Sequence, residues 1–174
     1  MLQDNLKLKH ELRFNNNGKF KIMLFTDIQD ILTPDKRTVE AIDKMLELEK
    51  PDLVLWCGDN SVSMTSEEEL SSFLKIMADP MEKRKIPWAH VFGNHDCEGG
   101  LEEEHQQKVY ESFPYCISKK DPSHVYGTGN HVLPIKASNS DKIKFYVWGL
   151  DSNQYIWEMM KDLLAVCETK QKKA

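Results

Sequence analysis

The sequence predicts an α/β protein in which three buried strands alternate with helices. Apolar runs suited to buried strands occur at residues 20–25, 53–57 and 88–92, and helical patterns of apolar residues separate them. Successive strand, helix and strand segments form βαβ units, whose strands lie parallel with a right-handed crossover. Since 174 residues can form a single domain with its own core, we expect one domain that covers residues 1–174.

The segment before the first buried run predicts an additional strand. Apolar and charged residues alternate from 6 to 14, as they do in a strand with one buried face. The sequence Asn-Asn-Asn-Gly follows at 15–18, and both residue types tolerate the positive φ of a tight turn. We therefore expect this strand to form a hairpin with residues 19–26.

Three helices are expected between and after the buried strands. The first should begin with Thr33 as its N-cap and end at Lys50, because a residue before proline avoids the α region. The second starts with a capping box formed by Ser66 and Glu69, and the third covers 101–113. The buried stripe of the first helix is predicted to consist of Val39, Ile42, Met45 and Leu46.

The last third of the chain has a different pattern. Short strands are expected at 124–126, 131–136 and 142–148, with glycine-rich or polar turns between them, and a final helix at 154–167. The two glycines between the first two of these strands lack the strand-then-helix context of a dinucleotide-binding loop. No glycine-rich loop follows the first buried strand either, so the sequence disfavours a nucleotide-binding protein.

Polar residues follow each of the three buried runs at its carboxyl end. Ligands of open α/β sheets bind beyond the carboxyl ends of the strands, and oxygen and imidazole ligands that converge there form a divalent-metal site. Glycines at 58 and 93 allow the backbone to leave the strand sharply and to approach a ligand closely. The three motifs are Thr26-Asp27-Ile28-Gln29, Gly58-Asp59-Asn60 and Gly93-Asn94-His95-Asp96.

In this order and spacing, the motifs resemble the first three motifs of the calcineurin-like metallophosphoesterases, and most closely the branch of the purple acid phosphatases. The resemblance covers about residues 20–167. It implies an α/β/β/α sandwich and an enzyme that hydrolyses a phosphate monoester or diester. It also implies two divalent ions (Mn, Fe, Mg or Zn) about 3.5–4 Å apart that share a hydroxide.

The resemblance assigns four metal ligands. Asp59 would bridge the two ions, Asp27 would bind the first together with Gln29, and Asn94 would bind the second through its amide oxygen. Members of the family commonly have histidine where this chain has Gln29. An amide oxygen favours Mg²⁺, Mn²⁺ or Ca²⁺ over zinc, so the identity of the metal stays open.

Two catalytic residues follow from the same resemblance. His95 would stay off the metals, where it would stabilise developing charge or protonate the leaving alkoxide. Asp96 would orient the ring of His95, as a carboxylate often does for a working imidazole. The other histidines that follow no ligand spacing are left out of the metal set, namely His90, His105, His124 and His131.

The family motifs continue further than this sequence does. A later metal-binding histidine and a Gly-His-x-His motif are absent before Ala174. We therefore expect a sandwich that is incomplete at its C-terminal end, a fragment with little or no activity alone, and an exposed sheet edge that could pair as a homodimer. The alternative is a non-catalytic binding module that retains the scaffold. Gln29 and the absent histidines favour this module, whereas the intact Asp59, Asn94, His95 and Asp96 favour an enzyme.

Composition argues against two classes of partner. A net charge of −5 and a pI near 5.7 give no basic footprint for nucleic acid. No apolar run approaches the roughly 18 residues of a membrane span, and the first residues lack the pattern of a signal peptide. The four cysteines are scattered and form no Cys-x-x-Cys pair, from which we expect a cytoplasmic protein.

Overall fold

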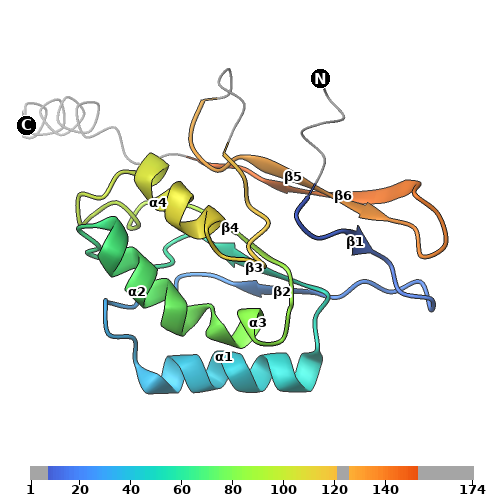
Figure 1. Ribbon diagram of the computed structural model, residues 1–174, viewed down its shortest axis with the longest axis horizontal. Coiled ribbons are helices and arrows are strands. Elements are labelled where there is room, and N and C mark those ends of the chain that lie inside the picture. Colours follow the sequence, from blue (N-terminus) through green and yellow to red (C-terminus); the bar gives the residue numbers. More distant parts are fainter. Residues whose placement is uncertain (1–7, 121–125, 153–174) are drawn as a thin grey trace, which may run out of the picture.

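The computed structural model describes residues 8–120 and 126–152, which form two stacked sheets with helices against one of them (Figure 1). The predicted helix 154–167 and most of the predicted strand 124–126 lie outside the described residues. In chain order the elements are β1 (Leu12–Arg13), β2 (Ile22–Phe25), α1 (Lys36–Glu49), β3 (Leu53–Cys57), α2 (Glu67–Met77), α3 (Asp79–Glu82), β4 (Trp88–Val91), α4 (Glu103–Glu111), β5 (His131–Lys136) and β6 (Ile143–Gly149).

The first sheet consists of the three predicted buried strands in the order β2-β3-β4. All of its pairs are parallel: Ile22 lies opposite Leu53, and Val54 lies opposite Trp88. The prediction of successive βαβ units is therefore confirmed. Because the three strands run in one direction, the motifs that follow them emerge at the same edge of the sheet.

The predicted hairpin between the first two strands is wrong. The turn itself forms, with the amide of Gly18 donating to Asn15 O (2.9 Å). However, β1 pairs in parallel with β5 in a second sheet of order β1-β5-β6, whereas β2 belongs to the first sheet. The reason is that Leu12 is buried in the space between the sheets, where it pairs with Ile135.

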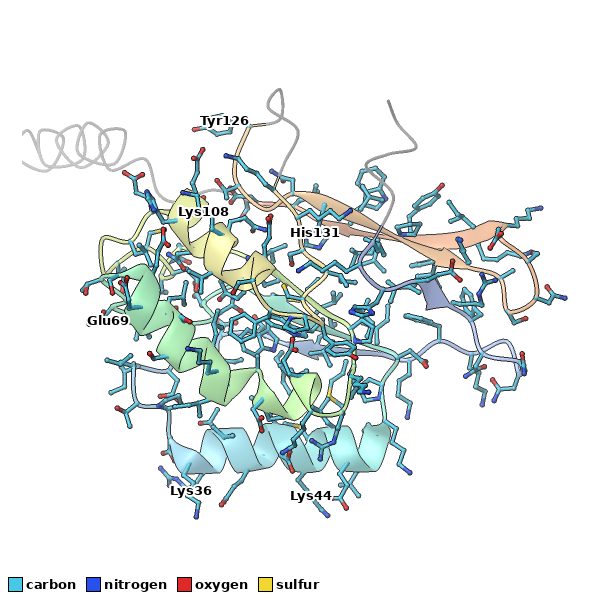
Figure 2. All side chains as sticks on the ribbon, viewed as in Figure 1. Lys36, Lys44, Glu69, Lys108, Tyr126 and His131 are labelled. Carbon is cyan, nitrogen blue, oxygen red and sulfur yellow. The ribbon has the colours of Figure 1, made fainter. Side chains whose placement is uncertain are left out.

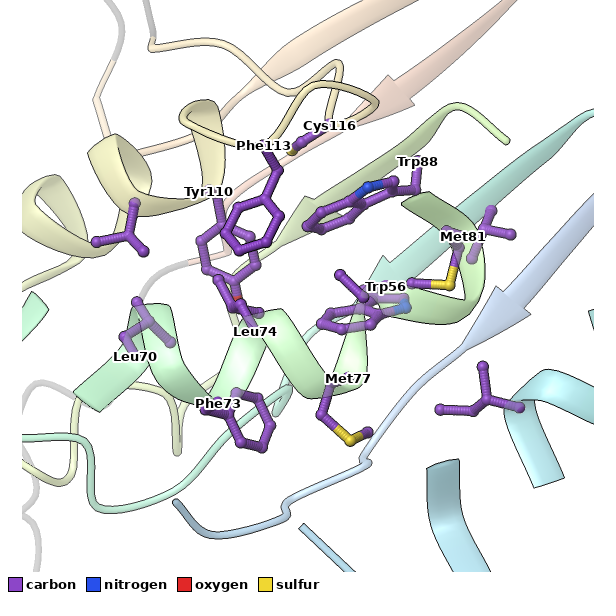
Figure 3. Packing of buried hydrophobic residues seen from close by; sticks show 14 of the residues in the cluster. Trp56, Leu70, Phe73, Leu74, Met77, Met81, Trp88, Tyr110, Phe113 and Cys116 are labelled. Carbon is purple, nitrogen blue, oxygen red and sulfur yellow. The ribbon is translucent and has the colours of Figure 1, made fainter. Parts of the chain in front are cut away.

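Alternate residues of the central strand β3 face two different cores. Val54 and Trp56 point to the helices, where they pack in a cluster of α1, α2, α3 and α4 side chains (Figure 3). Leu53 and the partly buried Leu55 point to the second sheet. This alternation stacks a helical layer, the parallel sheet and the second sheet, which confirms the predicted α/β sandwich. Within 8–120 and 126–152, no helix covers the outer face of the second sheet.

The helix boundaries follow local hydrogen bonds. The N-cap of α1 is Asp35, not Thr33, because the Asp35 carboxylate accepts from the amide of Arg37 (2.8 Å). The predicted end at Lys50 is confirmed. In the predicted stripe Ile42 and Leu46 are buried, but Met45 is exposed. Ser66 caps α2 as predicted.

His90 lies deep in the helical core and outside any ligand set. Its ring stacks on that of Tyr110, with the ring centres 3.6 Å apart, and the residue is buried. Burial lowers the pKa of His90 well below its ordinary value, with a further contribution from the nearby His131. The ring is therefore neutral in the folded protein, as expected for a packed core residue.

We predict that His90 contributes to acid sensitivity. Because its pKa is depressed by folding, its contribution to stability is present above the ordinary pKa of 6.5 and is lost as the pH falls through its lower folded value. In His90→Phe, which keeps an aromatic ring against Tyr110, the free energy of unfolding in urea should decline less between neutral and acidic pH. An equally steep decline in the variant would contradict this assignment.

Candidate metal centre at the carboxyl edge of the parallel sheet

The first and second motifs run side by side beyond the ends of β2 and β3. The amide of Asp27 donates to Gly58 O (3.1 Å), and the amide of Gln29 donates to Asp59 O (2.9 Å). A parallel bridge between Asp30 and Ser61 continues this pairing. The chain therefore holds Asp27 and Gln29 against the residue that the sequence predicts as the bridging ligand.

Three of the predicted ligands have left-handed backbones. Asp27, Gln29 and Asp59 have φ values of +53°, +47° and +50°. This conformation costs a residue other than glycine about 1–2 kcal/mol, and such strain persists where the surrounding structure enforces it, often at functional sites. Here the paired motif backbones enforce it. The sequence alone does not single out these turns, because aspartate and glutamine occur in other backbone conformations as well.

Asp59 connects the first motif to the third. Its Oδ2 accepts from Gln29 Nε2, and its Oδ1 accepts from the amide of His95, both at 3.0 Å. The residue is only 8% exposed. The two carboxylate oxygens thus contact two different motifs, one oxygen each.

Gly93 permits this close approach. A Cβ at Gly93 would lie 2.2 Å from Asp59 Oδ1 and 2.4 Å from Asp59 N, and real Cβ atoms do not come so close to other atoms. Gly58 approaches the same point from the other side, since its Cβ would lie 3.0 Å from Gly93 Cα. Both glycines therefore permit a close backbone approach between the second and third motifs, whereas the predicted approach to a ligand stays a prediction.

The buried side chain of Asp96 joins the second motif to the third through hydrogen bonds to backbone amides. Its Oδ1 accepts from the amides of Asn60 (2.9 Å) and Ser61 (3.1 Å), and its Oδ2 accepts from the amide of Gly93 (2.7 Å). The residue is fully buried. Burial raises the pKa of Asp96 to about 6, against the opposing effect of the three amides.

The carboxylate that contacts the His95 ring is Glu98, which corrects the prediction that Asp96 orients it. His95 Nδ1 lies 2.6 Å from Glu98 Oε1, whereas both Asp96 oxygens bind backbone amides. Glu98 also raises the pKa of His95, mainly through this hydrogen bond. Sequence reasoning missed Glu98 because no motif includes it; the spacing of three residues from His95, just before Gly99, is the only available signal.

Helix α4 supports the third motif from the core side. The side-chain amide of Gln106 donates to Asp96 O and to Leu101 O, both at 2.7 Å. Gln106 is fully buried, although most residues of α4 are polar or charged. The two bonds fix the backbone just after His95, a role that periodicity could not reveal.

The donor atoms fit a hard cation. Asp27 and Asp59 provide carboxylate oxygens. Gln29 provides Oε1, because its Nε2 donates to Asp59. The half-buried Asn94 lies in the chain between Gly93 and His95. Oxygen donors of this kind suit Mg²⁺, Mn²⁺ or Ca²⁺ better than zinc. The described part of the chain holds no group of three His, Cys, Asp or Glu side chains placed for a metal.

Electrostatics also favours a cation at this edge. Within residues 8–120 and 126–152, neither Asp27 nor Asp59 forms an ion pair with lysine or arginine. Two carboxylates on paired backbone segments without a cationic side chain favour a metal ion. The structure thus joins the side chains of Gln29 and Asp59 with the amide of His95, and it places Asp27 beside them by its backbone, whereas the Asp27 carboxylate accepts from Thr26 Oγ1. The ligand and catalytic roles of these residues and of Asn94 stay predictions.

The remaining described histidines have other partners. His105 Nδ1 lies 2.7 Å from Glu67 Oε1 on the helical side, and His131 Nδ1 lies 2.7 Å from Gly129 O at the second sheet (Figure 2). His90 is packed in the core, and His124 lies outside the described residues. His10 Nε2 lies 2.9 Å from Pro114 O, so none of these four described histidines joins the four donor residues.

Comparison with known proteins gives a consistent family. The model of the calcineurin-like phosphoesterases matches residues 20–172. Phosphatase DCR2 of Saccharomyces cerevisiae is 29% identical over 83% of this chain and 28% of its own length. Probable inactive purple acid phosphatase 29 of Arabidopsis thaliana is 28% identical over 84% of this chain and 44% of its own length. The chain therefore spans less than half the length of these two curated relatives.

Two further findings complete the comparison. The crystal structure of TT1561 of Thermus thermophilus matches with a TM-score of 0.40 and 16% identity, over 56% of this chain and 40% of that one; a likeness at this level adds nothing to the assignment. Among the helices of the described ranges, none has the length and apolar character needed to cross a membrane.

We predict that Gly93→Ala disrupts the contact between Asp59 and the third motif. The new Cβ would collide with the main-chain nitrogen of Asp59, so the backbone must shift, at a cost of about 1–3 kcal/mol. Two-dimensional NMR should show a large change in the amide resonance of His95, which donates to Asp59.

Gly100→Ala is the matched control. Gly100 has no atom within 4 Å of its would-be Cβ, and the variant carries only the cost of φ +89°. The His95 amide should keep its wild-type position in this control. An unchanged His95 amide in Gly93→Ala would contradict the tight approach.

Proposed function

This chain belongs to the calcineurin-like phosphoesterase family, and on that premise we propose that its three motifs form the metal-binding edge of an enzyme that hydrolyses a phosphate monoester or diester. The observation that carries the proposal is the position of Asp59. One of its oxygens faces the first motif and the other faces the third. A buried carboxylate shared by two loops in this way is suited to bridge two divalent ions.

Each ligand has a defined place in the proposal. Asp27 and Gln29 would hold one ion, Asn94 would hold the other, and Asp59 would contribute to both. Two divalent ions, when bound, would activate the attacking water and polarise the phosphoryl group. The paired backbones of the first two motifs and the carboxylate of Asp96 keep these donors in place before any ligand arrives. Such preorganisation reduces the entropic cost of binding.

His95 is the proton donor in this proposal. Its amide is fixed on Asp59 and its ring on Glu98, so the imidazole lies next to the ligand set without belonging to it. Negative charge on the departing oxygen is best neutralised by a group whose pKa lies near the working pH. The raised pKa of His95 increases the protonated fraction of the ring at neutral pH.

A non-catalytic binding module is the second candidate. Gln29 favours it, since an amide oxygen binds divalent ions more weakly than imidazole. Three relatives also carry the name of a probable inactive purple acid phosphatase. In this alternative, the same edge binds a cation and a phosphate group without hydrolysing an ester.

The decisive experiment combines metal binding with turnover. We expect isothermal titration calorimetry to show Mn²⁺ binding to the chain, and Asp59→Asn to weaken it by roughly tenfold to hundredfold, because the bridging charge is lost. Asp79→Asn, in α3 near the start of β4, is the control and should bind like the wild type. Hydrolysis of p-nitrophenyl phosphate and bis(p-nitrophenyl) phosphate is measured on the same samples.

Each outcome selects one function. Mn²⁺ binding and turnover that are both lost in Asp59→Asn support the enzyme. Binding that depends on Asp59 without turnover of either ester supports the binding module. Absence of binding for both Mn²⁺ and Mg²⁺ contradicts a metal centre on this chain.

We further propose that the chain forms a homodimer through the edge strand β6. Among the described residues, β6 pairs with β5 on one side only. Its large side chains are unusually accessible: Phe145 is 55% exposed, Tyr146 44% and Trp148 64%. An unpaired, hydrophobic strand edge is a ready template for another strand.

The strand is self-complementary about its centre. In an antiparallel pairing of two copies centred on Tyr146, Lys144 of each chain lies opposite Trp148 of the other, where a cation–π contact is favourable. Phe145 lies opposite Val147, and the two Tyr146 rings meet at the two-fold axis. This register places no like charges opposite each other.

Tyr146→Lys tests the dimer. The substitution sets two lysines opposite each other on the axis, which destabilises an antiparallel pair. We expect light scattering after size exclusion to give a dimer for the wild type and a monomer for this variant. Tyr126→Lys is the control, because Tyr126 is 84% exposed but lies outside β6. A wild type that stays monomeric at high concentration rules the dimer out.

A further inference from the structure

The turn after His95 brings Glu98 to the site, as a second acidic side chain besides Asp96. The amide of Glu98 donates to His95 O (3.1 Å), and the amide of Gly100 donates to Cys97 O (2.9 Å). A turn closed between residues three apart places their side chains on the same side of the chain. The local path of the backbone therefore explains why Glu98 faces His95.

This turn rests on the segment that follows the second motif. A Cβ at Gly99 would lie 2.1 Å from Met64 O and 2.4 Å from the carbonyl carbon of Ser63. Only glycine permits such close packing of two backbones. The position of Glu98 relative to the site is thus set by main-chain contacts on both sides and not by its side chain alone.

The contact defines which nitrogen of the ring carries a proton. Glu98 Oε1 lies 2.6 Å from His95 Nδ1, and an ionised carboxylate can only accept a hydrogen bond. Nδ1 must therefore be protonated, in the neutral ring as well as in the cation. The nitrogen that remains for a ligand is Nε2.

Asp96 cannot compete for this role. Its two oxygens already accept from three backbone amides, those of Asn60, Ser61 and Gly93. Turning one oxygen towards the ring would leave a buried amide without an acceptor. The two carboxylates therefore have different partners: Asp96 binds the backbones of the motifs, and Glu98 binds the imidazole of His95.

We propose that Glu98 is the positioning residue of His95, which locks the ring in its Nδ1–H form and presents Nε2 to the ester. The catalytic consequence rests on the proposed function. A water molecule loses one proton to solvent and its oxygen forms the new bond to phosphorus, the bond to the leaving oxygen breaks, and the electron pair of that bond stays on the leaving oxygen. The leaving oxygen takes the proton of Nε2, and the ring remains as the neutral Nδ1–H form bound to Glu98.

The test reads the tautomer directly and needs no turnover. Long-range ¹H–¹⁵N correlation spectra of the ¹⁵N-labelled chain, at alkaline pH where the ring is neutral, should show His95 with Nδ1 protonated. In Glu98→Ala the ratio of Nδ1–H to Nε2–H should fall by roughly tenfold or more, as expected for loss of a charged hydrogen bond. The His95 signals are assigned by their loss in His95→Ala.

Two controls separate positioning from a general change of structure. His105 is an internal reference, because its Nδ1 lies 2.7 Å from Glu67 Oε1 in the same kind of pair, and its tautomer should be unaffected. Glu102→Ala is the matched variant, since Glu102 is exposed and makes no capping hydrogen bond with its side chain. Glu98→Gln keeps an acceptor oxygen and should give an intermediate ratio.

The outcomes distinguish this inference from the proposed function. An Nε2–H ring in the wild type, or an unchanged ratio in Glu98→Ala, overturns the role of Glu98 whatever the activity. A shifted ratio establishes the positioning even where the wild type turns over no ester, and in that case only the proposed function fails. Where turnover is present, Glu98→Ala should lower kcat by roughly 10- to 100-fold with little change in KM, because the acid acts in the transition state.

Discussion

The buried carboxylate of Asp96 is the constraint on which the rest of the site depends. It is a single acceptor for three amides that belong to two different loops, those after β3 and β4. A buried amide without an acceptor costs about 1–3 kcal/mol, so the two loops are held together strongly. Once they are held, Gly93 lies against Asp59, and Asp59 can reach both the first and the third motif. The contact between Asp59 and the third motif therefore depends on this one carboxylate.

The parallel sheet gives the site its direction, and this part was predictable. Buried strands separated by helical patterns specify parallel pairing, and parallel pairing brings their carboxyl ends to one edge. The registers of β2, β3 and β4 agree with that expectation. Asp27, Gln29, Asp59 and His95 meet there because strand polarity is encoded in the periodicity of the sequence.

Other features depend on contacts between segments that are distant in sequence, which periodicity does not encode. The alternation in residues 8–14 is that of a strand, yet it cannot say that Leu12 pairs with β5 and not with β2. Gln106 looks like a polar surface residue, but the loop after His95 requires its amide in the core. Asp96 is adjacent to His95 in sequence, but its oxygens are taken by amides from elsewhere. Local patterns therefore locate the site, whereas long-range hydrogen bonds decide what each side chain does.

The left-handed backbones of Asp27, Gln29 and Asp59 restrict how this site can change over time. Valine, isoleucine and threonine fit such a conformation poorly, whereas asparagine, aspartate and histidine adopt it more readily than most residues. A position like 29 can thus exchange an amide for an imidazole without any rearrangement of the main chain. The preference for a hard or a softer metal ion can consequently change by replacement of a side chain alone, while the main chain keeps its conformation.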